Sequence, residues 1–170
     1  IGGFVGNAVR GTINLTGCLF SGKITYVFEK YPMRDGSTWY LGTNVGGMIG
    51  GLMVSPIYDN NGKASSVNVA NLSNCLSTGT IDVKIKDGSH SPNGTGSFIG
   101  WVGSGTVNIT DSYATSTAHN RTMHYNQKTA TIKGDAIILS NIALAGYNGY
   151  KFTSLDFNKY WAVAINPDST

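Results

Sequence analysis

The chain has 170 residues, of which 41% are hydrophobic and 12% are charged, and its formal net charge at pH 7 is +3. A chain with this much apolar surface can fold as one domain around a buried core, which excludes an intrinsically disordered protein. Its scattered basic residues argue against a nucleic-acid partner, and no apolar stretch is long enough for a membrane helix, so no membrane insertion is expected.

The first element along the chain is a short glycine-bounded block. It reads GGFVG at 2–6 and returns as GGMIG at 46–50 and GSFIG at 96–100. Each block precedes a longer segment, and a fourth such segment occurs without a block. These longer segments lie at 11–22, 66–79, 105–116 and 134–146. With their ends aligned, one column holds Cys18, Cys75, Ser112 and Ile142, and another holds Leu15, Leu72, Ile109 and Leu139.

The longer segments have the period of a β-strand. Apolar residues recur at every second position, as Ile13 and Leu15 do, and β-branched residues dominate. The flanking glycines predict corners with positive φ and a close approach of neighbouring coils. Repeats of a few tens of residues are typical of stacked arrays, in which each unit buries its apolar face against its neighbours. We therefore expect little helix, and coils about 4.8 Å apart with equivalent residues in register.

Insertions between these elements carry the candidate binding residues. The stretch YPMRDGSTWY at 31–40 places Tyr31, Trp39 and Tyr40 on a predicted loop. Aromatic rings stack on sugars and anchor protein partners, so a glycan or a host or cell-surface protein is a candidate ligand there. The alternative is that these rings pack back against the stack. In the second insertion, DNNG at 59–62 predicts a turn, because the spacing of a calcium loop is missing.

The last part of the chain departs from the repeat. The fourth copy has no glycine block, and residues 118–133 stand in its place. Trp101 aligns with Asn7 and is expected outside the corner. Trp161 is expected to cover the last coil, because an uncovered strand edge invites addition of another chain.

The glycine block followed by a GTI-x-N-type segment resembles the GLUG repeat of large secreted and surface proteins of bacteria, including adhesin-like proteins and some immunoglobulin A peptidases. The likeness covers roughly residues 1–25, 45–86, 96–116 and, more faintly, 134–169. It implies an all-β fold, a right-handed parallel β-helix (β-solenoid) with loop insertions. One domain is expected over 1–170 as a piece of a longer chain, since Ile1 opens within a repeat. Its rungs would lie near 2–25, 46–86, 96–116 and 134–146, with a terminal cap at 150–170.

The function implied by the resemblance is a non-catalytic structural or adhesive module of a bacterial extracellular or cell-surface protein. The alternative is a carbohydrate-binding or polysaccharide-processing β-helix domain. A glycosidase needs two carboxyl groups about 5 to 10 Å apart, and the nine acidic residues are dispersed. Asp111 and its equivalents Gly17, Asn74 and Asn141 suit a corner, and Asp82 alternates with Lys84 on an exposed strand face. No catalytic residue is assigned, and an enzyme is not expected.

Cysteines, histidines and glycosylation triplets have structural interpretations. Cys18 and Cys75 share a column, so adjacent coils would bring their Cα atoms within disulfide range. Two free, buried thiols are the preferred interpretation, because two cysteines alone are no disulfide framework. Neither has a neighbouring ligand and HExxH is absent, so no metal or cofactor is predicted. Exposed loop positions are expected for His90, His119 and His124. The triplets at Asn14 and Asn108 are interpreted as repeat residues.

Overall fold

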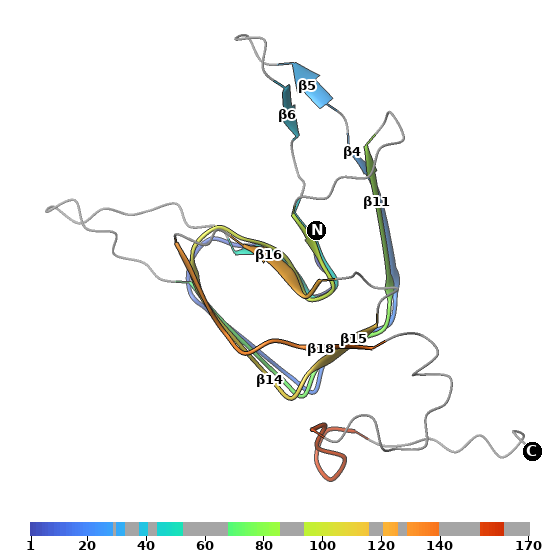
Figure 1. The fold of residues 1–170 in the computed structure, drawn as a ribbon, viewed down its shortest axis with the longest axis vertical. Coiled ribbons are helices and arrows are strands. Elements are labelled where there is room, and N and C mark those ends of the chain that lie inside the picture. The colour runs from blue at the N-terminus through green and yellow to red at the C-terminus, as the bar shows by residue number, and fades with distance from the viewer. Residues whose placement is uncertain are drawn as a thin grey trace, which may run out of the picture.

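The computed structural model describes residues 1–28, 30–32, 38–40, 44–52, 68–85, 94–115, 121–125, 129–139 and 154–161. These residues form an all-β fold of parallel strands stacked in sheets, and none of them is helical (Figure 1). Within this part of the chain there is accordingly no helix of the length and hydropathy that a membrane span requires.

The described residues follow one path four times, and each passage is here called a layer (Figure 1). Layer 1 comprises β1 (Val5–Ala8), β2 (Thr12–Thr16), β3 (Leu19–Phe20) and β4 (Lys23–Phe28). Layer 2 comprises β7 (Val45–Gly46), β8 (Ile49–Leu52), β9 (Val69–Ser73), β10 (Leu76–Ser77) and β11 (Thr80–Ile85). Layer 3 comprises β12 (Thr95–Gly96), β13 (Ile99–Val102), β14 (Gly105–Thr110) and β15 (Tyr113–Thr115). Layer 4 comprises β16 (Met123–Tyr125), β17 (Ala130–Lys133) and β18 (Ile137–Leu139).

Each long sheet takes one strand from every layer. The three four-stranded sheets have the orders β1-β8-β13-β16, β2-β9-β14-β17 and β3-β10-β15-β18, and two-stranded sheets join β4 to β11 and β7 to β12. All of these pairings are parallel. Between layers 1 and 2, β5 (Lys30–Pro32) and β6 (Thr38–Tyr40) form an antiparallel hairpin. The hydrogen bonds of the stack therefore join segments that are distant in sequence.

The predicted columns are confirmed in the first three layers. Leu72 pairs with Leu15 on one side and with Ile109 on the other. All three side chains belong to the core or pack against it, and their column runs along the interior of the stack. Strict period-two alternation explains the agreement, because a slip of one residue would turn every apolar side chain outward.

The predicted alignment of the fourth layer is wrong. Leu139 pairs with Thr115 rather than joining the Ile109 column, and Ala136 stands next to Ser112 because Ile137 pairs with Tyr113. The strand in line with β14 is β17, which lies upstream of the predicted rung at 134–146. Two similar apolar runs follow each other here, and the earlier one lies in line with β14 while the later one lies in line with β15. Of the residues 118–133 predicted to stand in place of the glycine block, those of β16 do so, since Met123 pairs with Ile99, whereas β17 lies in line with β14.

The glycines of the block permit close contact between layers. A Cβ on Gly46 would lie 2.6 Å from the backbone nitrogen of Gly100 and 2.8 Å from the carbonyl oxygen of Phe98, both in layer 3. A Cβ on Gly100 would overlap the carbonyl oxygen of Gly50. Because these obstacles are backbone atoms, no side-chain rotation can relieve them. The prediction of close layer contact at the glycines is confirmed.

The predicted corner is also confirmed. Gly17, Asn74 and Asp111 have φ angles of 62°, 53° and 48°. Glycine, asparagine and aspartate are the residues that tolerate this left-handed region best. Asp111 therefore has a conformational role, and Asn141, the predicted fourth member, lies outside the described residues.

Residues 154–161 pack on the outer face of the β3-β10-β15-β18 sheet, where Figure 1 shows them beyond β15 and β18. Trp161 Nε1 donates a hydrogen bond of 2.8 Å to the carbonyl oxygen of Asn74, and the backbone N–H of Asp156 donates one of 2.7 Å to Asn74 Oδ1. Leu155 is buried against Tyr113. The expectation that Trp161 covers the last layer is wrong, because this sheet presents apolar side chains outward, and the segment covers them.

Candidate functional site

The predicted aromatic site falls on the hairpin between layers 1 and 2. Tyr31 lies in β5 and Trp39 and Tyr40 lie in β6, with Tyr31 and Trp39 opposite each other in the antiparallel register. The stretch predicted as a loop thus contains two short strands. The side chains of these three residues lie outside the described part of the structure, so a ligand contact there stays a prediction.

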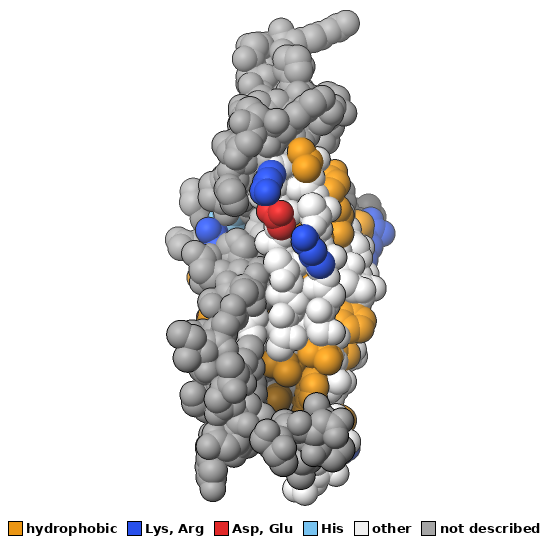
Figure 2. Space-filling model, turned by 90° about the vertical axis from the view of Figure 1, so that its right-hand side faces the viewer, with side chains coloured by type: hydrophobic (Ala, Val, Ile, Leu, Met, Phe, Trp, Pro, Cys, Tyr) orange, Lys and Arg blue, Asp and Glu red, His pale blue; other side chains and the backbone are white. Residues whose placement is uncertain are grey.

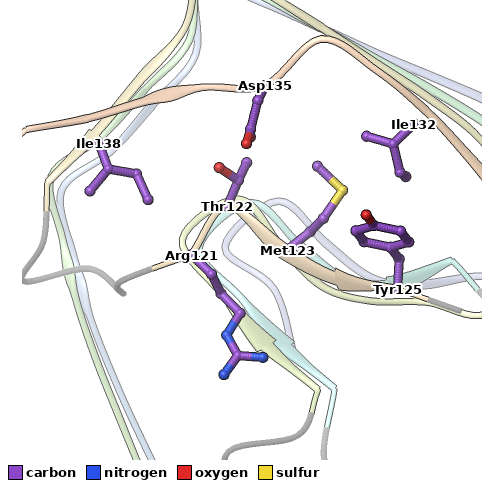
Figure 3. A pocket seen from close by; sticks show the side chains of 7 residues that line it. All are labelled: Arg121, Thr122, Met123, Tyr125, Ile132, Asp135 and Ile138. Atoms are coloured by element: carbon purple, nitrogen blue, oxygen red, sulfur yellow. The ribbon is translucent and has the colours of Figure 1, made fainter. Parts of the chain in front are cut away.

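The described residues contain a cavity of about 300 Å³ in layer 4 (Figure 3). Residues on β16, on β17, on β18 and beside them form its walls. The lining consists of Arg121, Thr122, Met123, Tyr125, Ile132, Asp135 and Ile138. Figure 3 shows Thr122, Met123 and Asp135 around the space, while the Arg121 side chain extends away from Asp135. The sequence interpretation assigned no function to any of these residues.

Thr122 lies at a position that larger side chains fill in other layers. The backbone N–H groups of Met48 and Ile49 donate to the carbonyl oxygen of Phe98, and those of Phe98 and Ile99 donate to that of Thr122. Met48 and Phe98 are fully buried. A threonine at this place leaves space that phenylalanine or methionine occupies in the layers below. Aligning residues 121–123 with the glycine block would have shown that Thr122 takes the place of Met48 and Phe98.

The chemistry of the cavity is limited. Thr122 is 4% exposed, and its Oγ1 has no hydrogen-bond partner among the described residues. Asp135 is the only carboxylate in the described lining, and its Oδ1 accepts a 2.8 Å hydrogen bond from the backbone N–H of Ala136. The described lining therefore offers a small group the hydroxyls of Thr122 and Tyr125, the single carboxylate of Asp135 and apolar side chains, but not the two carboxyl groups of a glycosidase. Across the described residues, no group of three or more His, Cys, Asp or Glu could hold a metal ion.

His124 is built into the stack, so its predicted place in an exposed loop is wrong. It lies in β16, in register with Trp101, and the two rings meet edge to face with centroids 4.8 Å apart. Its Nδ1 accepts a hydrogen bond of 3.0 Å from the backbone N–H of Gly94. Burial, and secondarily the charge of Arg121, lower the pKa of His124. The contacts thus favour a neutral ring. His90 and His119 lie outside the described residues.

Trp101 is partly exposed, in line with Asn7 and Gly51. The predicted alignment of Trp101 with Asn7 is confirmed. The ring of Trp101 contacts that of His124 in the next layer, so the two side chains form an aromatic pair on this sheet.

The two cysteines are free thiols, as preferred from the sequence. Cys75 is buried as predicted, whereas the predicted burial of Cys18 is wrong, because Cys18 lies in layer 1 and is partly exposed. Cys75 Sγ lies 3.2 Å from the carbonyl oxygen of Ser73 and 3.5 Å from that of Leu15. Burial, as the main cause, raises the pKa of Cys75 to about 11. A thiol with so little thiolate at neutral pH is a poor nucleophile, which favours a structural role for Cys75.

The outer face of the β2-β9-β14-β17 sheet holds a ladder of amides that joins three layers. Asn71 Nδ2 donates to Asn14 Oδ1 at 2.8 Å, and Asn108 Nδ2 donates to Asn71 Oδ1 at 2.6 Å. Beside it, the hydroxyl oxygens of Thr16 and Ser73 are 3.1 Å apart. The interpretation of Asn14 and Asn108 as repeat residues is confirmed. The recurrence of Asn71 in the same column was the signal for the ladder, and sequence reasoning missed it.

The face over β4 and β11 is largely uncharged, with a short row of basic and acidic side chains (Figure 2). Lys84 Nζ lies 3.3 Å from Asp82 Oδ2, and Lys84 is exposed. The predicted exposed strand face is thereby confirmed. A solvent-exposed ion pair of this kind contributes about 0 to 1 kcal/mol, so it keeps the face soluble more than it stabilises the fold.

No family model, no curated protein and no solved structure matches this chain.

Proposed function

We propose that the chain is a non-catalytic structural or adhesive module, built as a right-handed parallel β-solenoid of the GLUG type. In this proposal it belongs to a bacterial extracellular or cell-surface protein and spaces or presents a contact surface there. Contact with a glycan or a host or cell-surface protein would come from its outer faces and from the hairpin with Tyr31, Trp39 and Tyr40.

The observation that supports a scaffold most directly is that outward-facing polar side chains form hydrogen bonds with one another from layer to layer. Asn71 bonds to its counterparts Asn14 and Asn108 in the layers on either side. An enzyme would instead aim such groups at a substrate, with a nucleophile or a carboxylate pair converging on one point. Here the repeated residues bind their own equivalents, which is the arrangement of a rod held together layer by layer.

A carbohydrate-binding role is the second candidate, favoured by the composition of the β2-β9-β14 face. Apart from Val69, which lies between Thr12 and Thr106, that face carries hydroxyls and amides without a charge in the three layers, and neutral sugars are recognised by such groups. The residues concerned are Thr12, Asn14, Thr16, Asn71, Ser73, Thr106, Asn108 and Thr110.

The two candidates are separated by one set of measurements on the purified chain. A glycan array and a polysaccharide depolymerisation assay are run beside adhesion of cells that display the chain to immobilised host glycoproteins. Under the scaffold proposal, cells that display the chain should adhere more than cells that do not display it, and no sugar products should be released. Product release would overturn it. Glycan binding that is lost in Trp39→Ala and in Thr106→Ala, with the fold intact by circular dichroism, would establish the second candidate. A determined structure with left-handed or unstacked layers would overturn the solenoid.

A further inference from the structure

The two ends of the stack differ, and the end at layer 1 exposes residues that belong to an interior. Phe4, Met48 and Phe98 are equivalent residues of the glycine block, yet Phe4 is 51% exposed while Met48 and Phe98 are 0% exposed. Leu15 is partly exposed where Leu72 and Ile109 are buried. The same residue types in the same register are thus covered in layers 2 and 3 and uncovered in layer 1. We call the side of layer 1 that is turned away from layer 2 the free face.

Gly6 gives independent evidence about the free face. A Cβ on Gly50 would overlap the carbonyl oxygen of Gly6, and one on Gly100 would overlap that of Gly50, so each glycine makes room for the layer before it. A Cβ on Gly6 would meet no atom of the described residues within 4 Å. Glycine in a strand is less favourable than alanine by about 0.5 to 1 kcal/mol. Among the described residues Gly6 has no contact that requires glycine, whereas a further layer stacked on the free face would require it.

The amide ladder ends in the same way. Asn108 donates to Asn71 and Asn71 donates to Asn14, so the next acceptor would lie on the free face side of Asn14. Asn14 Nδ2 donates to no acceptor among the described residues. The ladder therefore presents an unused donor in the direction in which Gly6 leaves room.

Layer 4 lacks these features at the opposite end. Lys133 pairs with Asn108, so an ammonium group replaces the next amide of the ladder. The register shifts between Ile99 and Trp101, and this removes the counterpart of Gly100. Thr122 replaces the large residue of the block and leaves the cavity of Figure 3. A second copy of the chain could reach the free face in parallel register only through its own layer 4, which does not have the matching residues.

We propose that the free face of layer 1 is a docking surface for a further protein layer with the same repeat, stacked in parallel and in register. The docked layer would place a Leu or Ile over Leu15, an asparagine beside Asn14 and a glycine-bounded block against Gly6. It continues the interfaces between layers 1 and 2 and between layers 2 and 3. The proposal rests on the proposed solenoid and adds which end of it accepts a partner, and of what kind.

The probe for the test is a copy of residues 94–118 fused directly before Ile1. This copy keeps the natural spacing, because Met123 follows residue 118 by five positions and Val5, in the same register, would follow the fusion point by five. It contains no cysteine. Cys18 can then be followed alone in a Cys75→Ser background, where serine is acceptable because Ser112 holds the equivalent place in layer 3.

Thiol labelling of Cys18 under native conditions reports docking. We expect the fused layer to slow labelling of Cys18 by about tenfold or more, because the docked layer must open before reagent reaches it. A fused segment with the same residues in scrambled order should leave labelling at the rate of the unfused chain. If Cys75→Ser does not fold, the same rates are read by mass spectrometry of labelled Cys18 and Cys75 peptides in the wild-type background.

Gly6→Ala supplies the second arm. In the unfused chain it should raise the thermal midpoint by about 1 to 4 °C, because alanine is more favourable than glycine in a strand and its Cβ meets no described atom. In the fused chain it should restore Cys18 labelling toward the unfused rate. Unchanged labelling on fusion, or loss of stability from Gly6→Ala in the unfused chain, would overturn the proposal. Protection of Cys18 that rises with the concentration of the unfused chain would assign the face to a second copy and would also overturn it. A determined structure with intact stacked layers distinguishes these failures from failure of the solenoid itself.

Discussion

Truncation of the central apolar column gives the sharpest test of the stack. Leu72 is 1% exposed and lies between Leu15 and Ile109, so Leu72→Ala opens a cavity enclosed by layers on both sides. Leucine-to-alanine changes at fully buried sites cost about 2 to 5 kcal/mol, and the upper half of that range applies where neighbours cannot collapse into the space. Backbone hydrogen bonds hold the flanking strands in place, so we expect about 3 to 5 kcal/mol.

Leu15→Ala is the matched control, because it removes the same atoms from the same column in layer 1. Leu15 is partly exposed and has a neighbouring layer on one side. It loses less buried surface and leaves a gap that water can enter, so a cost of about 1.5 to 2.5 kcal/mol is expected, half that of Leu72→Ala.

Urea unfolding followed by circular dichroism measures both costs, provided that the slope of the transition is the same in each variant. For a chain of this size, 1 kcal/mol corresponds to about 2 to 4 °C in the thermal midpoint, which gives a second readout. Equal costs at the two positions, or a larger cost for Leu15→Ala, would contradict the assignment of layer 1 as an uncovered end and layer 2 as an interior one.

Three further predictions test the contacts between layers. Gly100→Ala should destabilise the chain by about 1 to 3 kcal/mol or more, since its Cβ would overlap backbone atoms of layer 2; a thermal midpoint equal to that of the parent would contradict this. Asn71→Ala, which removes two ladder bonds, should lower the urea midpoint about twice as far as Asn14→Ala, which removes one. Burial and Arg121 lower the folded-state pKa of His124 below its value in the unfolded chain. The unfolded chain therefore binds the proton more readily than the folded chain. The stability that depends on a neutral His124 is fully present above the unfolded-state pKa and is lost as pH falls through the folded-state pKa. His124→Asn, which keeps an acceptor for the N–H of Gly94, should flatten the pH dependence of the thermal midpoint between pH 8 and about 5, and an unchanged profile would refute the assignment.

Features that depend on local pattern were predictable from the sequence. The alternation of Ile13 and Leu15 indicated strands, and the equivalent places of Leu15, Leu72 and Ile109 in the aligned repeat segments indicated one column. The left-handed corner at Asn74 and Asp111 also followed from residue type, because few other residues accept that conformation. In such a stack every layer presents the same surface to the next, so identity of pattern is enough to predict register.

The candidate site was not predictable in the same way. Thr122, Met123 and Asp135 belong to the layer whose alignment failed, because an apolar run at 134–146 imitated the repeat more closely than the strand that the stack uses. His124 appeared to be a loop residue because its partners, Gly94 and Trp101, are distant in the chain. A site formed where the sequence departs from its repeat cannot be predicted from the repeat pattern.

The sequence by itself determined the single layer: its strands, its corners, its inward column and the glycines that let neighbours approach. The tertiary structure alone decided which faces of each layer are covered by other parts of the chain. Whether Leu15 or Leu72 is exposed depends on which sides have a neighbour, and Trp161 lies on a sheet face because Leu76 and Tyr113 need cover there. The physical reason is that local propensities act within a few residues, whereas burial and hydrogen bonding between layers join segments far apart along the chain.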